Sequence, residues 1–369
     1  MEWTTGSTVP EEFTAVARGV YRDDPHWIPE LPMAVERAFS PSNRYFEKNS
    51  AWMSCEAGKA RLAGFYNPSL VINGRHVAFF GYWETIDDAA ANRRLFSEFE
   101  SWAGSKGAGA VYGPINFSTF GPYRIRLNRF EDGCFPGEPY NPPYYERLMG
   151  ELGYSIAYRY YTLIGNLDTV YPPLDRFMVP VLLEKAEQGG IRFVPLTREY
   201  WDSHIEEIFG YVDIVFSSNF AYTPISYEEF RASMGAYFSR IFCPRASVLA
   251  LDPDDRIAGF FVNFPDYSEV CRQGADSAVP VHELNYEKHF PLIKNPLILG
   301  KTGGVHPKWR KFGLFTVMSC LGIKWSLPYY RRVAAATARE DNYSLRVGRM
   351  VFSKPEDIEH QYGLFAKCL

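Results

Sequence analysis

The spacing of apolar residues predicts the same order of strands and helices in both halves of the chain. In the first half, the patterns over 52–65 and 76–83 predict strands. Leu95 and Phe99 then share one face of a helix that follows Asp87-Asp88, and 158–164 predicts a closing strand. This half therefore contains enough segments for a sheet with covering helices.

The second half repeats this order. Its predicted elements are a hairpin over 247–251 and 257–264, a strand over 297–305, a helix over 313–325, a strand over 333–338, a helix over 342–347 and a closing strand over 361–368. We interpret the recurrence as an internal duplication, with a coincidental order of elements as the alternative.

The duplication predicts two lobes of α/β (α+β) type, each a mixed, twisted sheet flanked by helices. The expected N-terminal lobe covers 1–170 and the expected C-terminal lobe covers 191–369. Between them, 171–190 is predicted to hold a linker and a bridging helix. The linker is placed over 168–176, a segment that contains Tyr171-Pro172-Pro173.

Composition is that of a globular protein and excludes several classes of function. Lys and Arg number 39 against 43 Asp and Glu, so the net charge is −4, and nucleic acid is disfavoured as a partner. No apolar run approaches the ~20 residues of a membrane span, and the N-terminus lacks a signal-peptide pattern. The 6 scattered cysteines fit reduced thiols better than disulfides or a metal site. We therefore expect a cytoplasmic protein without membrane or metal.

The segment 297–315 carries the clearest chemical signal. An apolar strand is followed by a short basic stretch and then by an apolar helix, an arrangement that directs backbone N–H groups and a helix dipole at a bound phosphate. The residues expected to hold the ligand are Gly303, Gly304, Val305, Arg310, Lys311, Phe312, Gly313, Leu314 and Phe315. Substitution of Arg310 or Gly313 should then weaken ligand binding at little cost in stability. The alternative is an ordinary strand-to-helix turn with solvated lysines.

Here the chain resembles the GNAT acyltransferase superfamily, in which a strand ends in Val-x-Pro and Arg/Gln-x-x-Gly-x-Gly/Ala follows. Val305, Pro307, Arg310 and Gly313 match this motif, and Phe315 departs from its last position. The resemblance implies acetyl-CoA or another acyl-CoA as co-substrate, with its pyrophosphate on this loop. A bulky Phe315 would narrow the phosphate groove or indicate another thioester carrier, such as an acyl carrier protein.

The resemblance also implies catalytic and pantetheine-binding positions further along the chain. Asn342 matches the Asn that contacts the pantetheine arm, and Tyr343 is the candidate acid for the leaving thiolate. The family places that Tyr six residues after the Asn, where this chain has Gly348. Glu283 is the candidate base. Further candidates for the base, left open here, are His282, Glu287, His289, Asp266 and Glu269.

The first half resembles the two-domain GNAT-like proteins of bacteria. The matching phrases lie at 24–29 (DPHWIP), 79–84 (FFGYWE), 113–118 (GPINFS) and 140–145 (YNPPYY). In this half, Glu84, Asp87 and Asp88 stand where a phosphate loop would be, and their charges would repel a pyrophosphate. We therefore expect the N-terminal lobe to be structural or substrate-binding and to bind no CoA.

Together these observations predict an N-acyltransferase that moves an acyl group from acyl-CoA, or from a carrier-protein thioester, to a small-molecule amine. One alternative is an aminoacyl-tRNA-dependent transferase of related fold, which would need a basic surface. A second alternative is a catalytically silent binding protein of the same fold, suggested by Phe315 and by the missing Tyr at Gly348.

Overall fold

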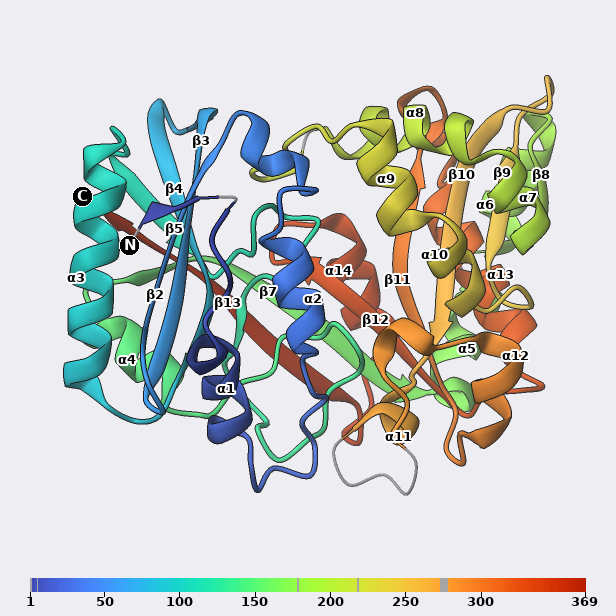
Figure 1. Ribbon diagram of the computed structural model, residues 1–369. Helices are drawn as coiled ribbons and strands as arrows, with labels where there is room; N and C mark the ends of the chain where they lie inside the picture. The colour runs from blue at the N-terminus through green and yellow to red at the C-terminus, as the bar shows by residue number, and fades with distance from the viewer. Residues whose placement is uncertain (1, 5, 178, 218, 273–277) are drawn as a thin grey trace. The chain divides into compact units, whose positions relative to one another are not determined.

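The computed structural model describes residues 2–4, 6–177, 179–217, 219–272 and 278–369 (Figure 1). Its contacts divide into two compact units, which we describe separately. The N-terminal unit comprises Met1–Arg159, Cys271–Pro280 and Gln361–Leu369. The C-terminal unit comprises Tyr160–Val270 and Val281–His360.

The N-terminal unit is built on a mixed sheet. Its strands are β1 (Glu2–Trp3), β2 (Ser50–Glu56), β3 (Ala60–Ile72), β4 (Arg75–Thr85), β5 (Ala110–Gly113), β6 (Ile125–Arg126) and β13 (Ile358–Cys368). Their order is β1-β2-β3-β4-β5-β13, with β6 on β13. The β4–β5 pair is parallel and the other pairs are antiparallel.

Helices cover both faces of this sheet. They are α1 (Glu11–Val20), α2 (Pro32–Ala38), the 3-10 helix η1 (Arg44–Glu47), α3 (Ala89–Ser105) and α4 (Tyr145–Glu151). Leu95 and Phe99 of α3 are buried against one face, as the sequence predicts. On the other face, Phe13 of α1 and Phe39 after α2 join an aromatic cluster with Phe65 and Tyr82. These aromatic side chains therefore form part of the core of the N-terminal unit.

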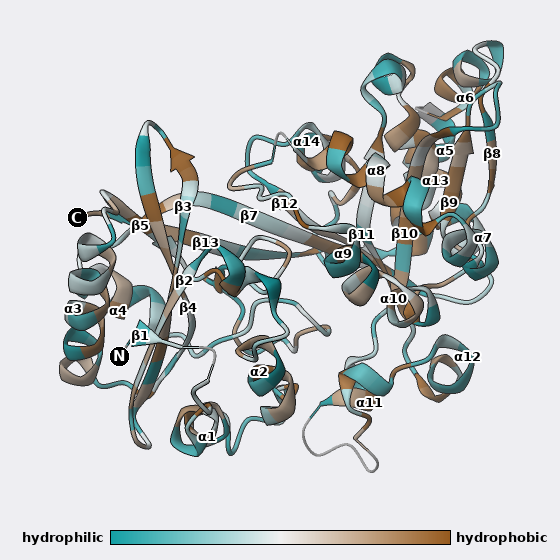
Figure 2. Ribbon diagram, turned by 45° about the horizontal axis from the view of Figure 1, so that its top comes forward, coloured by the Kyte–Doolittle hydropathy of each residue, from teal (hydrophilic) through white to brown (hydrophobic). Residues whose placement is uncertain are grey.

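The C-terminal unit has a second mixed sheet. Its strands are β7 (Ser155–Asn166), β12 (Arg332–Arg339), β11 (Leu297–Val305), β10 (Ile257–Pro265), β9 (Val248–Leu251) and β8 (Arg192–Pro195), in that order. The β11–β12 pair is parallel and the others are antiparallel. Strand β9 is apolar along its whole length (Figure 2) and is fully buried, because α13 lies against it.

The helices of this unit are more numerous. They are α5 (Leu167–Phe177), α6 (Val179–Gln188), α7 (Arg198–Ser203), α8 (Ile205–Phe216), α9 (Tyr227–Met234), α10 (Ala236–Ile241), α11 (Ser268–Cys271), η2 (Val281–Glu283), α12 (Tyr286–His289), η3 (Phe290–Leu292), η4 (Pro307–Phe312), α13 (Leu314–Ser326) and α14 (Tyr343–Val351). The bridging helix predicted within 171–190 corresponds to α6.

The predicted linker over 168–176 is wrong, because this stretch forms α5 with Pro172 and Pro173 inside the helix. Leu167, Val170 and Leu174 lie one helical turn apart and are buried in the core of the C-terminal unit. Burial of this apolar face outweighs the hydrogen bonds that the two prolines remove.

The strand that closes each half of the sequence lies in the sheet of the other unit. From Tyr160 onward, β7 follows the first half but pairs with β12 in the C-terminal unit. From Gln361 onward, β13 follows the second half but pairs with β5 in the N-terminal unit. The boundaries at 170 and 191 remain a prediction about the two halves of the sequence, whereas each compact unit includes chain from both.

Candidate functional site

The two parallel strands β11 and β12 separate part-way along their length. Their ladder runs from Leu297 opposite Arg332 to Gly300 opposite Ala335, and β11 then continues to Val305. The pairing of β11 with β10 shifts at the same point, because Val262 lies opposite Thr302 while Asn263 lies opposite Gly300. Lys301 is thus the extra residue of a β-bulge, which bends a strand and increases its twist.

The separation leaves backbone groups of β11 directed away from β10. Antiparallel pairing alternates, so that every second residue turns its N–H and C=O toward the partner strand. His306 N donates to Ala258 O at 3.0 Å, which places His306 and Gly304 on the β10 side. Gly303 and Val305 therefore point the other way, and Val305 O accepts from Arg310 Nε at 3.4 Å. These N–H groups suit a carbonyl oxygen laid along β11.

The basic stretch after β11 forms η4, which is anchored on one side and charged on the other. The His306 ring caps it by accepting from Lys308 N at 3.2 Å, and Pro307 occupies its first turn. Trp309 is buried with Val305 and Leu314 in one apolar cluster. The exposed side chains of η4 include three cations: Lys308, Arg310 and Lys311. The loop thus offers positive charge on a fixed backbone.

Gly313 stands at the N-cap position of α13, so the helix has no side-chain cap. Thr316 N donates to Gly313 O at 3.0 Å, while the first turn otherwise presents N–H groups and the positive end of the dipole. The corresponding helix of the N-terminal unit, α3, differs. There Asp88 accepts from Ala90 N at 3.0 Å and from Ala91 N at 2.9 Å. A carboxylate therefore already occupies the anion position in the N-terminal unit.

Residues at the end of α6 that support the loop were not predicted from the sequence. Lys185 Nζ donates to Lys311 O at 3.0 Å and lies 5.9 Å from the centre of the Phe312 ring. A Cβ on Gly189 would lie 2.8 Å from Phe312, so the end of α6 also contacts η4 closely. No local pattern in α6 distinguishes these residues, because their partners lie far along the chain.

The structure brings Asn342 and Tyr343 to the same sheet edge as the loop. Since β11 and β12 are parallel, the helices that follow them, α13 and α14, both begin at that edge. Asn342 caps α14 by accepting from Ser344 N at 2.9 Å, and its amide nitrogen remains a donor. Tyr343 starts the helix and is 70% exposed. Its hydroxyl is thus accessible, and its role as an acid stays a prediction.

The structure does not bring Glu283 to this edge. The short helix η2, which holds Glu283, directly precedes α12, whose Tyr286 is buried with Ile298 and Val333 at the starts of β11 and β12. Glu283 therefore lies toward the opposite end of β11 from Gly303, and its side chain is 62% exposed beside His282. The prediction of Glu283 as the base is therefore wrong on geometry, because an exposed carboxylate at the other end of β11 cannot reach an amine at the loop.

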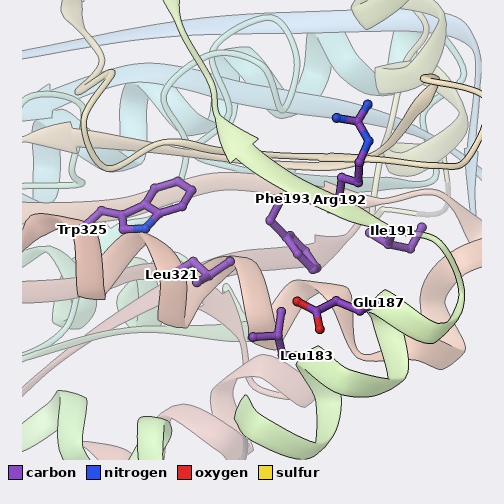
Figure 3. Close-up of a pocket in the computed structure, with 7 residues that line it drawn as sticks. All are labelled: Leu183, Glu187, Ile191, Arg192, Phe193, Leu321 and Trp325. Carbon is purple, nitrogen blue, oxygen red and sulfur yellow. The ribbon is translucent and has the colours of Figure 1, made fainter.

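A hollow of about 380 Å³ lies elsewhere in the C-terminal unit (Figure 3). It is lined by Leu183, Glu187, Ile191, Arg192, Phe193, Leu321 and Trp325. The α13 residues in this set come from its second half, away from Gly313. It contains none of the residues predicted for the thioester site.

No family model matches the chain. A tandem GNAT protein from the clavulanic acid biosynthesis pathway is similar in structure, with a TM-score of 0.51 and 12% identity over 96% of this chain and 92% of that one. The chain has the tandem GNAT fold. The fold expected from the sequence is thereby confirmed.

Two further proteins are similar to the chain. A GCN5-related glucosamine N-acetyltransferase region of a fungal multi-domain β-N-acetylglucosaminidase is similar with a TM-score of 0.52 and 11% identity, over 98% of this chain and 38% of that one. Protein YghO of Escherichia coli (strain K12) is 24% identical over 282 residues, which are 73% of this chain and 68% of that protein.

Two kinds of feature are absent from the residues that the structure describes. None of their helices is long and apolar enough to cross a membrane. No group of three or more His, Cys, Asp or Glu among them is arranged to hold a metal ion.

Proposed function

We propose that the protein is an N-acyltransferase that moves an acyl group from an acyl-CoA thioester to a small-molecule amine. The supporting observation is that the uncapped start of α13, the cations of η4 and the N–H groups of β11 that point away from β10 lie at one edge of one sheet. A thioester donor has the matching parts, because a pyrophosphate suits the first two features and a carbonyl suits the third.

In this proposal each part of the loop has a defined task. The N–H groups of Leu314 and Phe315 and the side chains of Arg310 and Lys311 hold the phosphates, while Asn342 donates to the pantetheine arm. The N–H of Gly303 or Val305 donates to the thioester oxygen and stabilises the charge that develops there. The neutral amine attacks the carbonyl carbon, the C–S bond breaks, and a proton from the amine ends on the sulfur. Tyr343 is the residue proposed to deliver that proton.

The side chain of Phe315 bears on the width of the groove that would hold the phosphates. It is the second residue of α13, and its ring lies edge-on to Phe261 at 5.4 Å between centroids. Because this contact turns the ring toward the sheet, the bulky side chain supports the core as well as the groove. CoA and the phosphopantetheine of a carrier protein share the phosphate that the loop would bind.

Native mass spectrometry with a panel of acyl-CoAs, combined with an assay of thiol release in the presence of primary amines, tests the proposal. We expect a bound acyl-CoA and thiol release that depends on the amine. Release from an acylated carrier protein alone would assign the donor to the carrier. A chain that binds acyl-CoA without transfer would be a binding protein, and one that uses only aminoacyl-tRNA would belong to the alternative class of transferase. Either of these last two results would contradict the proposal.

A further inference from the structure

Three polar side chains form a row across the sheet of the N-terminal unit. Cys55 on β2 lies opposite Arg61 on β3, and Arg61 lies opposite Glu84 on β4. Directly opposed residues project from the same face of a sheet. Arg61 and Glu84 would be expected to form an ion pair. Instead, Arg61 Nη2 pairs with Glu30, Arg61 is 2% exposed, and its Nε has no partner.

Glu84 is held by two tyrosines instead of by a cation. Its Oε2 accepts from Tyr21 OH at 2.9 Å and from Tyr145 OH at 2.7 Å. Among the residues that the structure describes, none donates to its Oε1. Glu84 and the neighbouring Tyr82 are only half-buried, and Oε1 is not one of the fully buried side-chain atoms that lack a partner. Glu84 therefore offers one open acceptor in an otherwise enclosed position.

The surrounding loops hold this position in place. Tyr82 has φ of 48°, in the left-handed region, and its N–H donates to Asn116 Oδ1 at 2.8 Å. Gly81 is required beside it, because a Cβ there would lie 2.5 Å from both Asn116 Oδ1 and Ile115 O. Strained backbone of this kind persists where its surroundings enforce it, and it is concentrated at functional sites. The loop after β5 is thus fastened to the end of β4, next to Glu84.

The Tyr145 side of the position is equally constrained. Asn141 accepts from Arg126 N at 2.7 Å and donates to Arg126 O at 3.2 Å, which fixes the chain just before α4. Tyr21 OH also lies 3.3 Å from Tyr140 O. We call the set Tyr21, Glu30, Arg61, Tyr82, Glu84 and Tyr145 the Glu84 site.

The charges of the Glu84 site select the chemistry of its ligand. Glu30 neutralises Arg61, and both tyrosines are neutral donors, so an ionised Glu84 leaves one negative charge uncompensated. An anion would be repelled. A divalent metal ion needs several converging oxygen ligands, whereas here Glu84 offers a single oxygen without a donor, in a site that also contains the tyrosines Tyr21, Tyr82 and Tyr145. An alkylammonium group fits, because it donates to a carboxylate and is attracted to ring faces.

We propose that the Glu84 site binds a primary amine, whose ammonium group donates to Glu84 Oε1. This site lies entirely in the N-terminal unit and is not the proposed thioester site. A result that contradicts one of the two proposals therefore does not contradict the other. It also gives a role to the carboxylate that sequence analysis treated only as a source of repulsion for phosphate.

Binding of the amine should be linked to protonation of Glu84. Burial raises the pKa of Glu84 to about 7, against the opposing effects of Arg61 and of the hydrogen bonds from Tyr145 and Tyr21, while Glu30 adds to the rise. Below this pKa the carboxyl is protonated and loses its attraction for an ammonium group. The apparent dissociation constant should therefore increase roughly tenfold between about pH 8 and about pH 6.

Isothermal titration of the full chain with ethylamine, putrescine and tyramine tests the proposal. We expect at least one amine to bind, with the pH dependence given above, and the isosteric alcohols of the same amines not to bind. In Glu84→Gln, which keeps an acceptor for both tyrosines, amine binding should fall at least tenfold. Glu146→Gln on the exposed side of α4 is the matched control and should bind as the wild type does.

Titration also supplies a readout that needs no variant. If the amine pairs with ionised Glu84, binding near pH 7 releases a proton, so the measured heat changes between buffers of different ionisation enthalpy. Unchanged amine affinity in a folded Glu84→Gln, or the absence of binding by all three amines at about pH 8, would overturn the proposal. A proton release that persists in Glu84→Gln would overturn it as well.

Discussion

Leu182 of α6 lies directly against Gly313, so that a Cβ on this glycine would come within 2.9 Å of Leu182 Cδ2. Gly313 also has φ of 71°, a conformation that side chains other than glycine adopt at a cost. From the sequence, Gly313 was expected to hold the ligand, so that its substitution would weaken ligand binding. The structure supplies two reasons for glycine that do not depend on a ligand.

Gly313→Ala should therefore destabilise the fold. The strained φ costs about 1–2 kcal/mol, and the displaced Leu182 adds to this. The structure thus argues against the expectation that a Gly313 variant costs little stability. Urea unfolding measures the loss, and the Leu182→Ala Gly313→Ala double variant should lose less than the sum of the two single variants. A Gly313→Ala protein as stable as the wild type would show that the loop relaxes freely.

Asp88→Ala should lower stability and leave CoA binding unchanged. Hydrogen bonds from Ala91 N and Ala90 N, together with Lys59, hold the pKa of Asp88 below its usual value. Because the pKa is lower in the folded state, ionised Asp88 stabilises the folded state above about pH 4. This stabilisation is lost as the pH falls through the pKa of Asp88 in the folded state. Urea midpoints of Asp88→Ala and wild type should thus converge in acid. Asp87→Ala, which removes a surface pair with Arg147, is the control. A constant difference at all pH values would contradict the capping role.

Glu84→Gln should stabilise the protein at neutral and alkaline pH. Because the folded pKa of about 7 lies above the unfolded value of ~4.3, the folded state binds the proton more tightly. Protonated Glu84 contributes its full stabilisation of the folded state below a pH of ~4.3, and this stabilisation is lost as the pH rises through about 7. The variant should gain on the order of 1–3 kcal/mol over wild type at about pH 8 and little at about pH 4. Urea unfolding at both pH values checks this, with Glu146→Gln as control. A gain in stability of Glu84→Gln at about pH 4, without one at about pH 8, would contradict this prediction.

Leu364→Ala should loosen the N-terminal unit, although residue 364 belongs to the second half of the sequence. Leu364 is 0% exposed in β13, which pairs with β5. The substitution should cost about 2–5 kcal/mol. Hydrogen exchange should accelerate in β5 and β6 more than in β11 and β12. Leu369→Ala, at a residue that is 44% exposed, is the control. Faster exchange confined to β11 and β12 would show that β13 stabilises the other unit.

Local patterns predicted most of the elements near the candidate site. The strand over 297–305 coincides with β11, the strand over 333–338 lies within β12, and the helix over 313–325 corresponds to α13. These elements have clear apolar periodicity. The basic stretch before α13 was expected to be a loop, and it forms the short helix η4, which the His306 cap and Trp309 burial stabilise.

Long-range relationships could not be predicted in the same way. The exchange of β7 and β13 depends on which edges pair, and no feature within either strand specifies its partner. Glu84 was visible only as a carboxylate before a helix, because its tyrosine partners lie 63 and 61 residues away. Likewise, Lys185 of α6 meets Lys311 across 126 residues. In each case the decisive contact joins segments that are distant in the chain.

The central claim is that one thioester donor binds to each chain, at the start of α13. Isothermal titration with acetyl-CoA of the wild type, Arg310→Ala, Lys311→Ala and the control Lys324→Ala, at the far end of the same helix, tests it most directly. Loss of a charge-assisted hydrogen bond of about 1.5–3 kcal/mol should weaken binding roughly 10- to 150-fold in Arg310→Ala. We expect one equivalent of CoA to bind per chain, with an affinity that is weakened in both loop variants and unchanged in Lys324→Ala. Two equivalents, or wild-type affinity in a folded Arg310→Ala Lys311→Ala double variant, would contradict it.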